Sequence, residues 1–172
     1  YKKAMEYYNK ALEFKEDLPE LYCNMALLYR KEGNLDLAEE FYMKGLKYSP
    51  HNFEIFFNLG LLYLEEGKLD RAEEHFKKSL ELNPNNPAAY SNLAVIYDSK
   101  GNTEEVIVSL EKAVSLNPSV PELQYNLAIA MIKAGRFKEA RTVLNKALEL
   151  GYPEHEISDK LNYINLYKKS ER

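Results

Sequence analysis

The chain contains no tryptophan, only three histidines and a single cysteine among its 172 residues. The lone Cys23 excludes an intrachain disulfide framework and any zinc site that needs several cysteines. No apolar run approaches the roughly 18 residues that a membrane-spanning helix requires, and no basic start followed by an apolar block indicates a signal peptide. With no such signal in the sequence, the cytoplasm is the default expectation for its location.

The sequence also lacks a field of basic charge. Its 23 basic and 27 acidic residues are interspersed and give a net charge of -4. A protein that binds phosphate backbones normally concentrates lysine and arginine on one face, so nucleic acid is not expected as a partner. The 45% hydrophobic and 29% charged content is typical of a folded globular protein.

Signatures of catalysis are missing as well. His51, His75 and His155 are far apart in sequence and lack metal-ligand spacing, so we expect each to be a solvated surface histidine. No strand-to-helix elbow with a nucleophilic serine and no phosphate-binding loop occurs. We therefore predict that the chain is not an enzyme, with no catalytic residue, metal site or cofactor.

The sequence instead repeats itself every 34 residues. Four glycines set this period, and aligning the chain on them gives four copies, residues 19–52, 53–86, 87–120 and 121–154. Glycine adopts the left-handed backbone conformation that ends many helices, so each copy is predicted to be two helices joined by a tight turn. The four glycines are Gly33, Gly67, Gly101 and Gly135.

Both helices of a copy carry an apolar face. The first helix repeats apolar residues at i, i+3, i+4 and i+7, which in the first copy are Tyr22, Met25, Ala26 and Tyr29. The second helix combines small and large residues, which in the first copy are Ala38, Tyr42, Gly45 and Leu46. Small residues allow two helices to approach closely while large ones fill the grooves between them.

These residues, together with Pro50, resemble the tetratricopeptide repeat signature, and the matching positions of the later copies resemble it too. The resemblance covers nearly the whole chain and implies an all-α fold, a right-handed α-solenoid of helix-turn-helix units in one domain, residues 1–172. Four positions depart from the other copies: Thr103, Val106, Gln124 and Met131.

The two ends of the chain differ from the copies. Residues 1–18 match only the second helix of a truncated copy, in which Ala4, Tyr8 and Ala11 would lack their partner helix. This open edge is a possible surface for self-association. Residues 155–172 carry a stripe of Ile157, Leu161 and Ile164 among mostly polar residues, which predicts a capping helix at the natural end of the array.

The resemblance implies that first helices line a concave groove. One asparagine per copy should then form a ladder along it, because a side-chain amide can pair with the backbone of an extended peptide whatever its side chains. Apolar pockets beside the ladder would bind the peptide's apolar anchors. The expected peptide-binding residues are Asn24, Asn58, Asn92, Asn126, Phe57, Leu61, Val95, Tyr125 and Ile129.

Two structural interpretations stand beside this hypothesis. The asparagines could hydrogen-bond to neighbouring backbone, and the aliphatic residues Leu27, Leu61, Val95 and Ile129 could pack against the next copy. The function also has two alternatives, the recognition region of a larger enzyme such as a protein glycosyltransferase, or a self-assembling scaffold. Asparagine ladders similar to this one occur in O-linked N-acetylglucosamine transferases.

Charge on the first helices restricts the expected partner. Some members of the family clamp a ligand's terminal carboxylate with basic groove residues, whereas the relevant positions here hold Cys23, Phe57, Ser91 and Tyr125. Acidic residues outnumber basic ones on the expected groove face. We therefore expect the partner to be a neutral or mildly basic extended segment of a protein.

Overall fold

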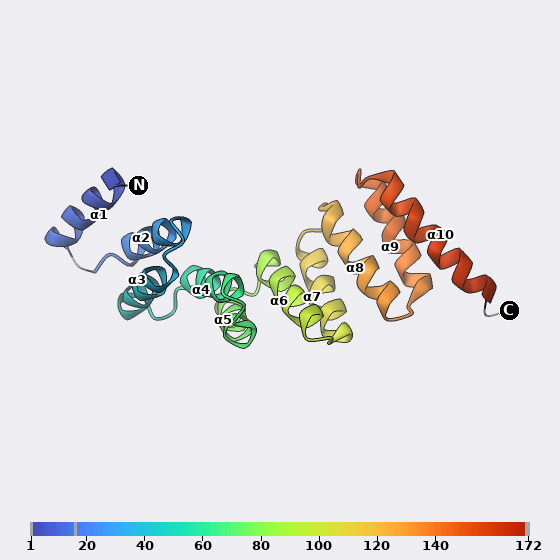
Figure 1. Cartoon of the computed structure of the whole chain (residues 1–172), viewed down its shortest axis with the longest axis horizontal. Coiled ribbons are helices and arrows are strands. Elements are labelled where there is room, and N and C mark those ends of the chain that lie inside the picture. The colour runs from blue at the N-terminus through green and yellow to red at the C-terminus, as the bar shows by residue number, and fades with distance from the viewer. Residues whose placement is uncertain (1, 16, 171–172) are drawn as a thin grey trace. The chain divides into compact units, whose positions relative to one another are not determined.

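The computed structural model describes residues 2–15 and 17–170, and in that part of the chain all regular structure is helical (Figure 1). Tyr1, Glu16, Glu171 and Arg172, which belong to the expected end segments, lie outside the described residues. The expected all-α fold of helix-turn-helix units is confirmed. Its helices are α1 Lys2–Phe14, α2 Pro19–Lys31, α3 Leu35–Tyr48, α4 Phe53–Glu65, α5 Leu69–Leu82, α6 Pro87–Ser99, α7 Thr103–Leu116, α8 Pro121–Lys133, α9 Phe137–Glu149 and α10 Glu154–Ser170.

The helices form two compact units. Unit 1 runs to Pro84 and contains α1 to α5, and unit 2 begins at Asn85 and contains α6 to α10. Within a copy the two helices pack as a pair: α2 with α3 and α4 with α5 in unit 1, and α6 with α7 and α8 with α9 in unit 2. Each 34-residue period of the sequence thus corresponds to one helix pair.

Local sequence explains where the helices begin and end. Asn52 and Asn86 precede α4 and α6, and their side-chain oxygens accept hydrogen bonds from backbone N–H groups of the first turn. Proline occupies the first position of α2, α6 and α8, where its missing N–H costs nothing. The expected left-handed glycines are confirmed, because the four turn glycines have φ between 73° and 77°.

Small residues hold the helix pairs together. A methyl group built on Gly60 would lie 2.7 Å from the Phe76 ring, and one on Gly45 would lie 2.8 Å from Cδ1 of Ile55. Ser79 is also buried, and its hydroxyl donates to the carbonyl of Phe53 at 2.9 Å. In both copies of unit 1, the helices therefore approach so closely that only a glycine or a small residue fits at these positions.

Two departures from the repeat pattern are accommodated in unit 2. Gln124 is buried, and its Nε2 donates to the carbonyl of Pro118 at 3.2 Å, so the amide replaces aromatic packing with a bond to the preceding turn. Val106 is buried as well and lies at the wall of a cavity, which gives its extra methyl groups room.

The last helix packs on α9 through the expected stripe. Ile157 and Ile164 are fully buried and Leu161 is half-buried. Its other face is less polar than expected, because Tyr163, Leu166 and Tyr167 are exposed. In unit 1, α1 likewise exposes Tyr7 and Phe14, while the residues that were expected to lack a partner are half-buried; these are Ala4, Tyr8 and Ala11.

The turn glycines give a test of backbone conformation. Nothing lies within 4 Å of a methyl group built on Gly101, so Gly101→Ala creates no clash, yet it places a β-carbon at φ +76°. We expect Gly101→Ala to lower the free energy of unfolding by about 1 to 2 kcal/mol, measured by urea titration. Gly101→Asn is the control, because asparagine tolerates this conformation, and it should cost clearly less. Equal losses for the two variants would contradict this explanation.

Candidate functional site

A cavity opens among the helices of unit 2 and brings together four of the nine expected peptide-binding residues. It measures about 310 Å³ and lies among α6, α7 and α8. Its base and walls are mainly aliphatic, and its polar lining is concentrated on α6 and α8. The lining residues are Ser91, Asn92, Ala94, Val95, Asp98, Val106, Leu110, Asn126, Ile129, Ala130 and Lys133.

The four asparagines have different surroundings. Asn92 is half-buried, and its Nδ2 donates to the carbonyl of Ala88 at 2.9 Å, within its own helix. Asn58 Nδ2 donates to the sulfur of Cys23 at 3.8 Å, which links α4 to α2. Asn24 and Asn126 are exposed, and the side chain of neither makes a hydrogen bond within the described residues. The structural interpretation thus has examples in Asn92 and Asn58, whereas peptide contact by the asparagines stays a prediction.

The structure places the other expected residues outside the unit 2 cavity. Phe57 and Leu61 belong to unit 1 and are half-buried, and the Phe57 ring lies 5.6 Å from that of Phe76. Tyr125 is in unit 2, where its ring stacks on Tyr152 at a centroid distance of 4.2 Å. Both aromatic side chains thus contribute to packing between helices and turns.

An ion pair lies on the first helices of each unit, with the signs of the two charges reversed. In unit 1, Nε of Arg30 on α2 lies 2.8 Å from Oε2 of Glu65 on α4. At the corresponding positions of unit 2, Nζ of Lys133 on α8 lies 2.7 Å from Oδ1 of Asp98 on α6. From sequence these four charges appear independent, whereas in the structure each has a partner of opposite sign, so the rim of the unit 2 cavity is locally neutral.

Unit 1 has a hollow at the corresponding place, but that hollow does not reach the second helix of its copy. It measures about 260 Å³ and is bounded by Leu27, Arg30, Lys31 and Glu65, with no residue of α3 in its wall. Cys23 lies nearby on α2, half-buried. Burial and the charge of Glu54 raise the pKa of its thiol, against the lowering effect of the Asn58 hydrogen bond. The thiol is therefore protonated at neutral pH and poorly nucleophilic.

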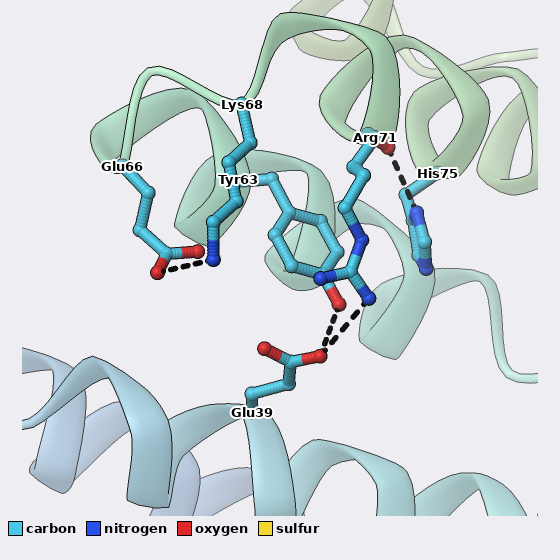
Figure 2. Close-up of polar contacts among 6 residues, drawn as sticks. All are labelled: Glu39, Tyr63, Glu66, Lys68, Arg71 and His75. Atoms are coloured by element: carbon cyan, nitrogen blue, oxygen red, sulfur yellow. Dashed lines mark hydrogen bonds and ion pairs between the residues drawn. The ribbon is translucent and has the colours of Figure 1, made fainter.

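A polar cluster links the first copy of unit 1 to the second (Figure 2). Glu39 of α3 accepts a hydrogen bond from the hydroxyl of Tyr63 at 2.6 Å and another from Arg71 at 3.2 Å. The Arg71 guanidinium lies 4.1 Å from the centre of the Tyr63 ring. His75 packs edge-on against the same ring, and its Nδ1 lies 2.8 Å from the Arg71 carbonyl. His75 is thus half-buried at the surface and packs against Tyr63, a contact that was not expected.

The polar cluster is a structural link between the two repeats of unit 1. Glu39, Tyr63 and Arg71 interact with one another through hydrogen bonds and a cation–π contact, and the Tyr63 side chain is almost fully buried.

Across the described residues, no group of three histidine, cysteine, aspartate or glutamate side chains is arranged to hold a metal ion. None of the helices in that part of the chain has both the length and the apolar character needed to span a bilayer.

Two buried tyrosines make stability sensitive to alkaline pH. Burial is the main cause that raises the pKa of Tyr63 well above its usual range, and its hydrogen bond to Glu39 adds to it. Burial also raises the pKa of Tyr42, whose hydroxyl has no hydrogen-bond partner among the described residues. A raised folded-state pKa means that the unfolded chain loses its proton first, near pH 10.

We therefore expect the free energy of unfolding to fall as the pH rises above about 10, by about 1.4 kcal/mol per pH unit for each of these tyrosines. Tyr63→Phe should reduce that slope by one such contribution, and should cost about 1 kcal/mol at neutral pH through the lost hydrogen bond. Urea titrations from pH 8 to 11 measure both effects. Tyr7→Phe, at an exposed position, is the control. An unchanged slope for Tyr63→Phe would contradict this account.

Sequence reasoning missed the residues that form the floor of the unit 2 cavity. Leu110 and Ala130 were not among the residues that the sequence singled out for the site. The signal was present in the alignment of the copies, because Leu110 stands where Tyr42 and Phe76 stand in the first two copies. Ala130 stands where the first helix of the second copy has Leu62. Both changes replace a large side chain with a smaller one.

Comparison with protein families gives a consistent result along the chain. Models described as tetratricopeptide repeat match residues 19–52 and 53–86, residues 75–107 and residues 99–157. A model described as TPR repeat matches residues 1–33. A comparison with curated protein sequences gave no match.

Solved structures with the same fold include three examples of low sequence identity. YrrB, described as a TPR protein with an unusual peptide-binding site, is 20% identical with a TM-score of 0.83, covering 94% of this chain and 84% of its own. Pseudomonas aeruginosa pilF is 20% identical with a TM-score of 0.79, covering 98% and 83%. MamA from Desulfovibrio magneticus is 20% identical with a TM-score of 0.77, covering 88% and 85%. At these identities the likeness establishes the fold alone.

Proposed function

Because this chain belongs to the tetratricopeptide repeat family, we propose that it is a protein-interaction scaffold that holds an extended segment of a partner protein against its first helices. The observation that carries the proposal is the unit 2 cavity, where Asn92 and Asn126 border an aliphatic floor. Amide and aliphatic groups side by side suit a peptide, which offers backbone hydrogen-bonding groups and side chains together. No catalytic role is assigned to this chain.

The two asparagines at the cavity have side-chain amide groups that are available to hydrogen-bond a ligand. The side chain of Asn126 makes no hydrogen bond within the described residues, and Asn92 uses only its Nδ2 there, which leaves its carbonyl oxygen as an acceptor. A peptide backbone presents one N–H donor and one C=O acceptor per residue, so these amides can bind it without reading its side chains. Affinity from backbone pairing and selectivity from the cavity would then be separate properties.

Charge favours a neutral or mildly basic segment. Glu20, Glu54 and Glu122 are exposed on the first helices, while the nearby charged pairs Arg30 with Glu65 and Lys133 with Asp98 cancel one another. An acidic segment would meet these carboxylates without a basic clamp to hold it. The description of YrrB as a peptide-binding protein supports a peptide as the class of ligand.

One observation favours self-association as a second candidate function. Phe14 on α1 is 91% exposed and Tyr7 is 70% exposed, so this helix carries large apolar side chains in water. Such a surface can bind a second copy of the chain. Light scattering of the wild type and of Tyr7→Ser, Phe14→Ser separates the candidates: a wild-type mass above the monomer that falls to the monomer in the variant supports self-association, and a monomer in both removes it.

The peptide proposal is tested with a displayed library of random peptides, selected on the immobilised chain. The best peptide, labelled with fluorescein, is then titrated with wild type and with an Asn92→Ala, Asn126→Ala variant. Two lost hydrogen bonds of about 1 kcal/mol each predict affinity at least tenfold weaker for the variant. Asn145→Ala, an exposed asparagine on α9, is the matched control and should leave the affinity within about twofold.

Circular dichroism melting curves should show that both variants keep their helical structure, because alanine is favourable in helices. The proposal fails if selection enriches no peptide over bare matrix. It also fails, as far as the asparagines are concerned, if the double variant and Asn145→Ala bind the selected peptide equally well.

A further inference from the structure

We propose that the unit 2 cavity is an anchor pocket for one large uncharged apolar side chain of the bound segment, of leucine to phenylalanine size. This inference rests on the proposed function and specifies what the site selects. At the equivalent positions of unit 1, the larger side chains of Tyr42 and Leu62 fill the interior beneath the surface hollow. The chain therefore supplies its own comparison between a closed and an open site.

The open site arises from substitutions between equivalent positions two copies apart. Leu110 replaces Tyr42 on the second helix, and Ala130 replaces Leu62 on the following first helix. Tyr42 and Leu62 are both 0% exposed, so in unit 1 these larger side chains occupy the interior. Val95, in place of Leu27, removes a further methylene at the rim. One change goes the other way, from Ala38 to Val106, and it is too small to offset the loss of an aromatic ring.

The lining of the two hollows follows this difference. The unit 2 cavity reaches Val106 and Leu110 of α7, which are otherwise only 5% exposed. The unit 1 hollow is lined by residues of α2 and α4 alone, with no contribution from α3. Of these two hollows, only the one in unit 2 extends down to the second helix of its copy, which makes it the deeper of the two.

The size and polarity of the cavity define its occupant. At about 310 Å³ it falls at the lower end of the range for small-molecule pockets, about 300 to 1,000 Å³, and it exceeds the volume of about ten liquid water molecules. Its floor of Ala94, Val106, Leu110 and Ala130 offers water no hydrogen bonds. An apolar side chain that displaces this water gains the free energy of burial.

The charges at the rim exclude a charged occupant. The cavity lining contains two ionic groups, Asp98 and Lys133, and they pair with each other at 2.7 Å and 3.0 Å. A lysine or glutamate side chain entering the floor would lose its hydration without gaining a free counter-charge. Charge complementarity therefore favours an uncharged side chain, while Asn92 and Asn126 bind the backbone on either side of it.

The test uses small probes, so that it does not depend on knowing the partner. N-acetyl-phenylalaninamide, N-acetyl-leucinamide and N-acetyl-lysinamide are titrated into the protein with labelled methyl groups, followed by NMR. The two apolar probes should shift the methyl signals of Val95, Val106, Leu110 and Ile129 in a saturable manner, with a dissociation constant in the millimolar range. The lysine probe should shift them at least tenfold less at equal concentration. Leu27 and Leu61 of unit 1 should not respond.

The filled variant carries the three residues found at the equivalent positions of unit 1, Val106→Ala, Leu110→Tyr and Ala130→Leu. Unit 1 already accommodates this set, so the variant is expected to fold, and Ala130→Leu alone serves as a second, milder filling variant. Val108→Tyr adds an aromatic ring at an exposed position of α7 and is the matched control. Both filling variants should abolish the probe-induced shifts, whereas Val108→Tyr should keep them.

The outcomes separate this inference from the proposed function. Absence of saturable shifts, equal shifts with the lysine probe, or shifts that persist in both filling variants would overturn the anchor pocket, even if selected peptides bind through the asparagines. Conversely, selective shifts that the filling variants remove would support the pocket, even if the asparagine variants leave peptide affinity unchanged.

Discussion

The structure depends on close packing between a large side chain of the second helix and a small residue of the first helix, which is seen directly between Phe76 and Gly60. The residues equivalent to Phe76 in the other copies are Tyr42, Leu110 and Leu144, all at least 95% buried, and those equivalent to Gly60 are Ala26, Ala94 and Ala128. The space between the two helices must hold the side chains at both positions, so a larger residue at one requires a smaller residue at the other. Phe76 has a glycine opposite it, and even a methyl group on Gly60 would come within 2.7 Å of its ring. The helix pair closes only when this shared volume is right.

The same position connects the fold to the proposed site. An aromatic residue such as Tyr42 completes the core and leaves only a hollow at the rim, whereas Leu110 leaves space that Ala130 does not fill. A repeat protein can thus open a pocket at one place along the array while each copy keeps its pair of packed helices. Binding selectivity would follow from the choice of core residue on the second helix, one layer below the surface asparagines.

Much of this could be predicted from the sequence, and the missing parts have a physical explanation. The 34-residue period, the turn glycines and the position of the asparagines all follow from local pattern, because they depend on neighbours within one helix or turn. The distinct surroundings of Asn58 and Asn126 do not, because they depend on which side chain lies opposite on the next helix. The packing of His75 could not be predicted for the same reason, since the Tyr63 ring reaches it from the other helix of the copy. A cavity is harder still, because it is the difference between the space among three helices and the summed volume of the side chains that line it.

The most direct test of the central claim is a crystal structure of the chain bound to a peptide selected on it. The account predicts an extended peptide on the first helices of unit 2, with an uncharged apolar side chain enclosed by α6, α7 and α8 and the Asn126 amide bonded to the peptide backbone. A peptide bound on the second helices, or one that crosses the first helices while the cavity holds only water, would contradict it.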